Sequence, residues 1–187
     1  MSTIEDIHGF GDQFTNQLQR LEEADIPDGD RDAIQSFIRH QDVQRGLAAS
    51  TLVNNLSHLR LSAERSDTPL TEMDRGDVDG LLFQYKHDRD YSEGTLRNYR
   101  KAFRKFFRFL DREWAEDIEI GSVPQREVDT DKVLSKEDLT ALRDAARNPR
   151  DKALIEMLVD TGLRIGALGT LRVGDVETGN RAGVVTL

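Results

Sequence analysis

The sequence contains no cysteine, which excludes disulfide bonds and thiolate metal sites. Its four histidines, at positions 8, 40, 58 and 87, form no HxxxH or HExxH pair, so we expect no metal site. No apolar run approaches the roughly 20 residues that a membrane-spanning helix needs. The first residues also lack the basic and then apolar order of a secretory signal. Together with the lack of a Gly-rich phosphate loop, these absences predict a cytoplasmic protein with no membrane segment and no small-molecule cofactor.

Basic residues are scarcer than acidic ones, at 26 Lys and Arg against 35 Asp and Glu, for a net charge of −9. Because phosphate binding relies on Lys and Arg displacing counterions, this sum alone argues against a nucleic-acid partner. The excess is concentrated at the start, however, since residues 1–32 hold nine acidic and only two basic side chains. Abundant Asp with few Lys resembles the acidic style of proteins from salt-loving organisms. With 37% hydrophobic residues, the chain can still bury a core.

Apolar residues recur at helical spacing through most of the first half. They predict an acidic amphipathic helix near residues 10–24 and further helices that begin near positions 30, 50, 75 and 92. We expect Asp30 to cap the second of these helices. The last one, residues 92–114, carries a stripe typical of a helix packed into a bundle: Leu96, Tyr99, Phe103, Phe106, Phe107 and Leu110.

The opposite side of helix 92–114 is basic. Between Glu93 and Arg112, seven cations stand against two acids, namely Arg97, Arg100, Lys101, Arg104, Lys105, Arg108 and Arg112. The plain alternative is a solvated helix side, which explains most charge runs in proteins. Their concentration in an otherwise acidic chain favours contact with phosphates.

Residues 119–132 have the Gly, Ser, Pro and charge content of an exposed linker. Beyond it we expect helices at 136–147, 150–161 and about 165–171, and an isolated β-strand in the final GVVTL, which lacks a partner in the chain. The sequence therefore predicts four parts: an acidic N-terminal helix (1–29), a helical domain (30–118), a linker (119–132) and an incomplete second domain (133–187).

Three segments carry a family resemblance. VDTGLRIGALGTLRVGDV, from Val159 to Val176, resembles the first conserved box of the tyrosine recombinase (phage integrase) family. SEGTLRNYRKAFRKFFRFL is similar to the last major helix of the family's core-binding domain, and LSKEDLTAL to the opening of its catalytic domain. The resemblance covers roughly residues 30–187. It implies a mainly α fold, with an N-terminal helical bundle of the SAM-like core-binding type followed by a truncated, mostly helical catalytic-domain start with one terminal β-strand.

Within this box the resemblance assigns the family's first catalytic arginine to Arg164, just after a helix end that we expect Gly162 to form. A planar guanidinium can bridge two phosphate oxygens. The alternative is that Arg164 caps carbonyls or pairs with Asp160. Three residues further on, where the family usually has an acid, this chain has Ala167. The family's nucleophilic tyrosine and HxxR pair lie beyond this part of the fold, so we expect no DNA cleavage by this chain alone.

The resemblance further implies that core-binding helices clasp double-stranded DNA, and it makes Asn54, Asn55 and His58 candidates for contact beside the basic helix. We therefore expect a DNA-binding protein of site-specific recombination or integration; self-association on DNA stays open. Two alternatives remain. The chain is a noncatalytic DNA-binding regulator, or it is a helical protein-interaction module without a DNA role, as the acidic surface suggests.

Overall fold

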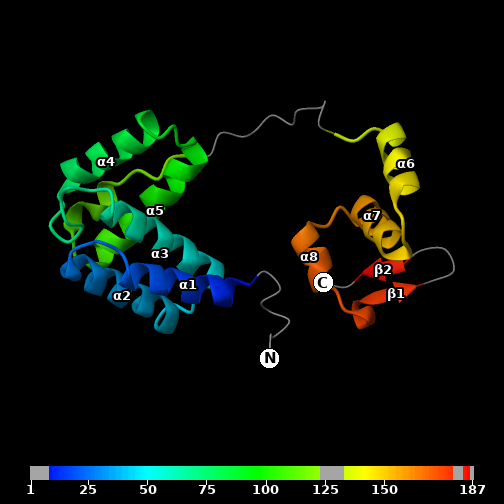
Figure 1. Ribbon diagram of the computed structural model, residues 1–187, viewed down its shortest axis with the longest axis horizontal. Coiled ribbons are helices and arrows are strands. Elements are labelled where there is room, and N and C mark those ends of the chain that lie inside the picture. Colours follow the sequence, from blue (N-terminus) through cyan, green and yellow to red (C-terminus); the bar gives the residue numbers. More distant parts are fainter. Residues whose placement is uncertain (1–8, 123–132, 179–182, 186–187) are drawn as a thin grey trace. The chain divides into compact units, whose positions relative to one another are not determined.

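The computed structural model describes residues 9–122, 133–178 and 183–185, which fall into two compact units that we treat separately. Residues 9–122 form a helical unit, and the later residues form a smaller second unit (Figure 1). The fold is mainly α, as the sequence predicted. None of the described helices is both long and apolar enough to span a bilayer.

The helical unit consists of five α-helices and a short 3-10 helix. They are α1 (Phe10–Glu22), α2 (Asp28–Val43), α3 (Ala49–Ala63), α4 (Arg75–His87), α5 (Glu93–Phe109) and the 3-10 helix η2 (Glu113–Asp117). Helix α3 packs against α1, α2 and α5, while η2 folds back on α5. The acidic first helix is therefore part of the same bundle as the helices that follow it.

Helix α5 supplies much of the core of this unit. Its side chains Leu96, Tyr99, Phe103, Phe106 and Phe107 are all buried, as the apolar stripe predicted, whereas Leu110, just beyond the end of α5, is only partly buried. The rings of Phe37 and Phe106 meet edge to face, with centroids 5.5 Å apart, which joins α2 to α5. Because this stripe is buried, the opposite side of α5 is left at the surface with its basic residues.

Asp30 does not cap α2, contrary to the expectation from the sequence, because that helix begins two residues earlier at Asp28. The Asp30 side chain is instead fully buried. It accepts hydrogen bonds from the backbone N–H of Leu70 at 2.7 Å and from the N–H and hydroxyl of Thr71, both at 2.9 Å. A buried carboxylate thus ties the start of α2 to the segment before α4.

The second unit contains three α-helices, a 3-10 turn and a short hairpin. They are α6 (Lys136–Ala145), α7 (Pro149–Thr161), α8 (Ile165–Thr170), η4 (Val173–Asp175), β1 (Val176–Thr178) and β2 (Gly183–Val185). The strand expected near the end is present as β2, but the prediction that it is isolated was wrong. It pairs antiparallel with β1, a strand that the sequence analysis did not predict. Among the described residues of this unit, Leu168 is the one buried hydrophobic side chain.

Candidate nucleic-acid interface

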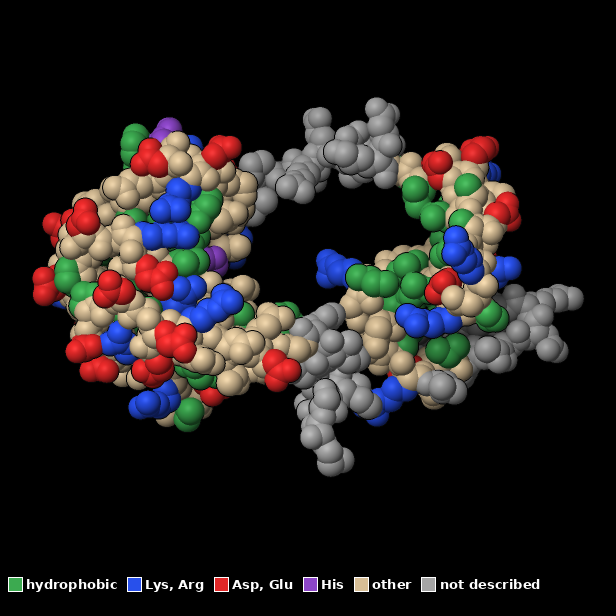
Figure 2. Space-filling view, in the orientation of Figure 1, with side chains coloured by type: hydrophobic (Ala, Val, Ile, Leu, Met, Phe, Trp, Pro, Cys, Tyr) green, Lys and Arg blue, Asp and Glu red, His purple; other side chains and the backbone are tan. Residues whose placement is uncertain are grey.

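The basic side of α5 divides into two groups that face different neighbours. We call Arg97, Arg100, Arg104 and Arg108 the arginine row, and Lys101 and Lys105 the lysine pair. Figure 2 shows Lys and Arg side chains near the middle of the visible face of the helical unit, with Asp and Glu side chains both beside them and around the margin. The two groups differ in whether their side chains have hydrogen-bonding or ionic partners among the described residues.

The C-terminal half of the arginine row is held by η2. Arg104 and Arg108, four residues apart on one face of α5, both donate to the carboxylate of Glu116. The hydrogen bond from Arg104, followed by that from Arg108, lowers the pKa of the Glu116 carboxyl. One acid therefore compensates two arginines.

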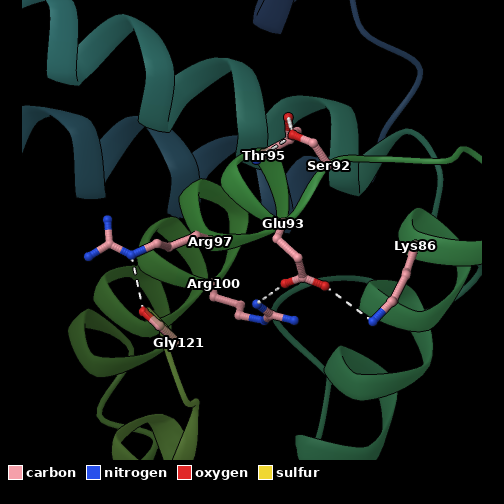
Figure 3. A network of polar contacts seen from close by, with 7 residues as sticks. All are labelled: Lys86, Ser92, Glu93, Thr95, Arg97, Arg100 and Gly121. Atoms are coloured by element: carbon pink, nitrogen blue, oxygen red, sulfur yellow. Dashed lines mark hydrogen bonds and ion pairs between the residues drawn. The ribbon is translucent and has the colours of Figure 1, made fainter. Parts of the chain in front are cut away.

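The N-terminal half of the row is also engaged (Figure 3). The Nε of Arg97 donates to the carbonyl oxygen of Gly121 at 3.1 Å, where the chain leaves the helical unit. Glu93 lies between two cations, 3.1 Å from the Nζ of Lys86 and 3.3 Å from the Nη1 of Arg100. The hydrogen bond from Lys86 has the largest effect in lowering the pKa of the Glu93 carboxyl, and that from Arg100 lowers it further. All four arginines thus have partners within the protein.

The lysine pair faces α3 across a groove. The groove has a volume of about 270 Å³ and is lined by Thr51, Asn54, Asn55 and His58 of α3 and by Asn98, Lys101 and Lys105 of α5. Partial burial lowers the pKa of Lys105, and the nearby charges of Lys101 and then Arg45 lower it further. Within the described parts of the chain, none of these three cations forms an ion pair with a carboxylate. We call this site the α3–α5 groove.

The α3 side of the groove is polar, and its residues differ in their exposure and in whether they have hydrogen-bond partners within the protein. Asn54 is exposed. Burial lowers the pKa of the half-buried His58, and its Nδ1 has no hydrogen-bond partner among the described residues. Asn55 is only 6% exposed, and its amide donates to the side-chain oxygen of Gln41 at 2.6 Å. The amide of Asn55 is thus committed to packing between α3 and α2.

The sequence analysis missed one residue that lines the groove, Asn98, and one cation that lies near it, Arg45. Asn98 could have been found, because it lies three residues before Lys101 and therefore on the same side of α5. Arg45 lies between α2 and α3 and gives no periodic signal; its place beside Lys105 depends on how those helices pack. Arg45 and Lys105 also line a second hollow of about 480 Å³, whose walls include Phe37, Leu47 and Phe109.

In the second unit, Arg164 is exposed at the position just before α8. Gly162, with φ of 63°, ends α7 in the left-handed conformation, as the sequence predicted. The Arg164 side chain has no hydrogen-bonding or ionic partner in the described part of the chain, so neither a carbonyl cap nor a pair with Asp160 is observed. Across this unit, Arg143 forms a two-pronged ion pair with Glu156, at 2.7 and 2.8 Å, which joins α6 to α7.

The three tyrosines belong to the packing of the helical unit. Tyr85 and Tyr99 are buried, and Tyr91 stacks on Tyr99 with ring centroids 5.7 Å apart. The Tyr91 hydroxyl accepts a hydrogen bond from Arg65 at 3.0 Å. Nowhere in the described ranges do three or more His, Asp or Glu side chains cluster so as to hold a metal ion.

The known proteins that this chain resembles in sequence are tyrosine recombinases. No family model and no solved structure matches the chain. Several curated proteins do: the tyrosine recombinase XerD of Lacticaseibacillus casei is 34% identical over 160 residues, and that of Vibrio vulnificus (strain YJ016) is 30% identical over 165. XerD of Oceanobacillus iheyensis is 27% identical over 157 residues. The matches cover 77%, 81% and 78% of this chain, respectively, and 52% of each relative, so the chain spans about half the length of these proteins.

Proposed function

Because this chain belongs to the tyrosine recombinase family, we propose that its helical unit binds double-stranded DNA through the α3–α5 groove. The observation that carries the proposal is that Lys105 lies near the charges of Lys101 and Arg45, and that none of the three has a carboxylate partner among the described residues of a chain with net charge −9. The exposed Asn54 and the half-buried His58 lie on the opposite wall of the groove.

The charge arrangement gives a physical reason for this choice. Partial burial, and then the nearby charges of Lys101 and Arg45, lower the pKa of Lys105, and a polyanion in the groove would favour its charged form. Each phosphate they neutralise releases condensed counterions, which drives binding. The amides of Asn54 and Asn98 add hydrogen-bonding groups that can contact phosphates or base edges. The arginine row offers less, since each of its guanidinium groups already donates to a carbonyl or a carboxylate of the protein.

We further propose that residues 30–118 act as the core-binding domain and that residues 133–187 are the start of a catalytic domain. In this proposal Arg164 contacts the phosphate of the DNA backbone at which the strand is exchanged. The exposed position of its guanidinium, free of other described partners, supports such a role. We assign no nucleophilic role to the packed tyrosines of the helical unit. The chain would thus contribute DNA binding to site-specific recombination or integration.

The test is duplex DNA binding by the full chain over a series of salt concentrations. Three phosphate contacts in the groove and one by Arg164 predict a slope of log affinity against log salt of about −3.6. The double substitution Lys101→Gln and Lys105→Gln should reduce this slope to about −1.8. The control is Lys86→Gln, which removes one positive charge from a lysine that is paired with Glu93 outside the groove. Equal binding by the double variant and the control would contradict the proposal.

A protein-interaction module is the second candidate, and one observation favours it. The second hollow beside Lys105 has the apolar side chains Phe37, Leu47 and Phe109 in its walls, which suit a protein partner better than a phosphate backbone. The same salt series separates the two, because a chain without a DNA role would show weak binding with little response to salt.

A further inference from the structure

We infer that Glu116 is an internal competitor of DNA for Arg104 and Arg108, so that half of the arginine row is held in reserve until phosphates displace this carboxylate. The inference rests on the DNA-binding role proposed above and adds a form of control to it. Arg104 and Arg108 belong to the basic side of α5 that the sequence predicted to contact DNA, but in the structure both are paired with Glu116.

The geometry of the contact is that of a phosphate mimic. One oxygen of the Glu116 carboxylate accepts from the guanidinium of Arg104, and the other accepts from that of Arg108. Two oxygens that share one negative charge and bridge two guanidinium groups present the same pattern as a backbone phosphate. Whatever binds these arginines from outside must therefore replace the same two sets of hydrogen bonds.

The competitor is tethered but can move. On either side of it, Ala115 and Ile118 are each only 1% exposed, and the ring of Trp114 packs against that of Phe107 with centroids 4.7 Å apart. The backbone of η2 is thus fixed on α5, which keeps the carboxylate constantly within reach of both arginines. The Glu116 side chain itself is 53% exposed, so it can rotate into water without unfolding η2. A pair this exposed is screened by salt and readily exchanged.

Glu116 differs from the groups that hold the other two arginines of the row. Arg97 is held by the carbonyl of Gly121, which carries no net charge, and Glu93 serves Arg100 together with Lys86 from another helix. Glu116 alone faces two cations of the row with one carboxylate. Removing its charge therefore frees two adjacent guanidinium groups at once, next to Lys105 of the groove.

The decisive comparison is between Glu116→Gln and Glu113→Gln in the full chain. Glu113 lies in the same 3-10 helix, is exposed and forms no ion pair with any described residue, so both variants lose one negative charge. We expect Glu116→Gln to bind duplex DNA at least about fivefold more tightly than Glu113→Gln at low salt. Its salt slope should be steeper by about 1.8, for two additional phosphates. Equal affinity and slope in the two variants would overturn the inference.

A second measurement tests the arginines themselves. Arg108→Gln should weaken DNA binding less than about twofold in the wild-type chain, where Glu116 occupies it, but more than about fivefold in the Glu116→Gln chain, since contacts that share a partner are not additive. Losses of the same size in both backgrounds would exclude competition. Trp114, the single tryptophan, reports on η2 through its emission. An unchanged emission maximum in Glu116→Gln supports a docked η2, whereas a red shift would show that Glu116 holds η2 in place and would overturn the competitor role.

These outcomes are distinguishable from failure of the groove proposal. If the lysine-pair variant binds like the wild-type chain but Glu116→Gln still exceeds Glu113→Gln, the groove is wrong and the competitor role stands. If neither the wild-type chain nor Glu116→Gln binds DNA, both the DNA role and the competitor role fail together.

Discussion

The ring of His58 lies 4.3 Å from the ring of Tyr99, with 57° between their planes, where α3 and α5 form the groove. Tyr99 is in turn packed against Tyr91 and Tyr85. His58 therefore stands between the aromatic packing of the bundle and the lysine pair, so a proton on this imidazole would affect both the stability of the helical unit and the charge of the groove.

This position predicts opposite responses of stability and DNA binding to pH. Burial lowers the pKa of His58, so the folded protein takes up this proton less readily than the unfolded chain. The stability that neutral His58 provides is present above the unfolded pKa of about 6.5 and is lost as the pH falls towards the lower folded pKa. Bound phosphates instead favour the protonated form, so DNA affinity should rise over the same interval.

The measurement is urea unfolding and DNA affinity of the wild-type chain and His58→Gln from about pH 7.5 to about pH 5.5. His58→Gln should lose the part of both responses that is due to this residue. The control is His87→Gln, at an exposed position on α4 outside the groove, which should respond to pH like the wild-type chain. If His58→Gln and His87→Gln behave alike, His58 does not couple the two properties.

Asp30 should be among the polar residues on which the helical unit depends most. Asp30→Ala leaves the N–H groups of Leu70 and Thr71 without their acceptor, at a cost of about 3 kcal/mol in the free energy of unfolding. Asp32→Ala, on the exposed side of the same helix, should change it by less than about 0.5 kcal/mol. Urea unfolding followed by Trp114 emission gives both values, and a small loss in Asp30→Ala would argue against the buried carboxylate as a tie.

The same substitution should have opposite effects at two glycines of the helical unit. Gly80 lies inside α4 with open space where a Cβ would stand, so Gly80→Ala should stabilise by about 0.8 kcal/mol through helix propensity. Gly46 has φ of +56° between α2 and α3, and Gly46→Ala should cost about 1 kcal/mol. Open space surrounds both positions, so the sign reports backbone conformation alone. Thermal unfolding of the two variants checks the prediction.

Arg164 should add one phosphate contact to DNA binding by the full chain. We expect Arg164→Gln to make the salt slope less steep by about 0.9. Arg147→Gln removes the same charge from another exposed arginine of the second unit, just after α6, and should leave the slope unchanged. An identical change in both variants would show that only the net charge of this unit matters and that Arg164 has no special contact.

The sequence was sufficient for the helices and for the family. Periodic apolar residues predicted the buried stripe of α5. The start of α6 expected at residue 136 is also confirmed, because Ser135 and Asp138 form a capping box there. The resemblance to tyrosine recombinases is confirmed by the comparisons. The cap expected at Asp30 was wrong because α2 begins at Asp28, and the Asp30 carboxylate instead accepts a hydrogen bond from the distant Leu70.

The site was less predictable, for reasons that differ between residues. Asn55 lies three residues after Leu52 and four before Leu59, so helical spacing alone would have placed it on the buried stripe of α3. The division of the basic face of α5 was not accessible in this way. It depends on Glu116, which a 3-10 helix folds back onto Arg104 and Arg108, and no periodic pattern predicts such a return.

The two units differ in how much hydrophobic surface they bury, and this difference determines which unfolding measurements can detect the effect of a substitution. Among the described residues, every buried hydrophobic side chain except that of Leu168 lies within residues 9–122. Heat-capacity change and sensitivity to urea both scale with the surface that unfolding exposes. A melting curve of the whole chain would therefore record the loss of α1 to α5 and be nearly blind to α6, α7 and α8. Local unfolding around Arg164 therefore has to be measured for individual residues, by amide hydrogen exchange or chemical shifts, because calorimetry would not detect it.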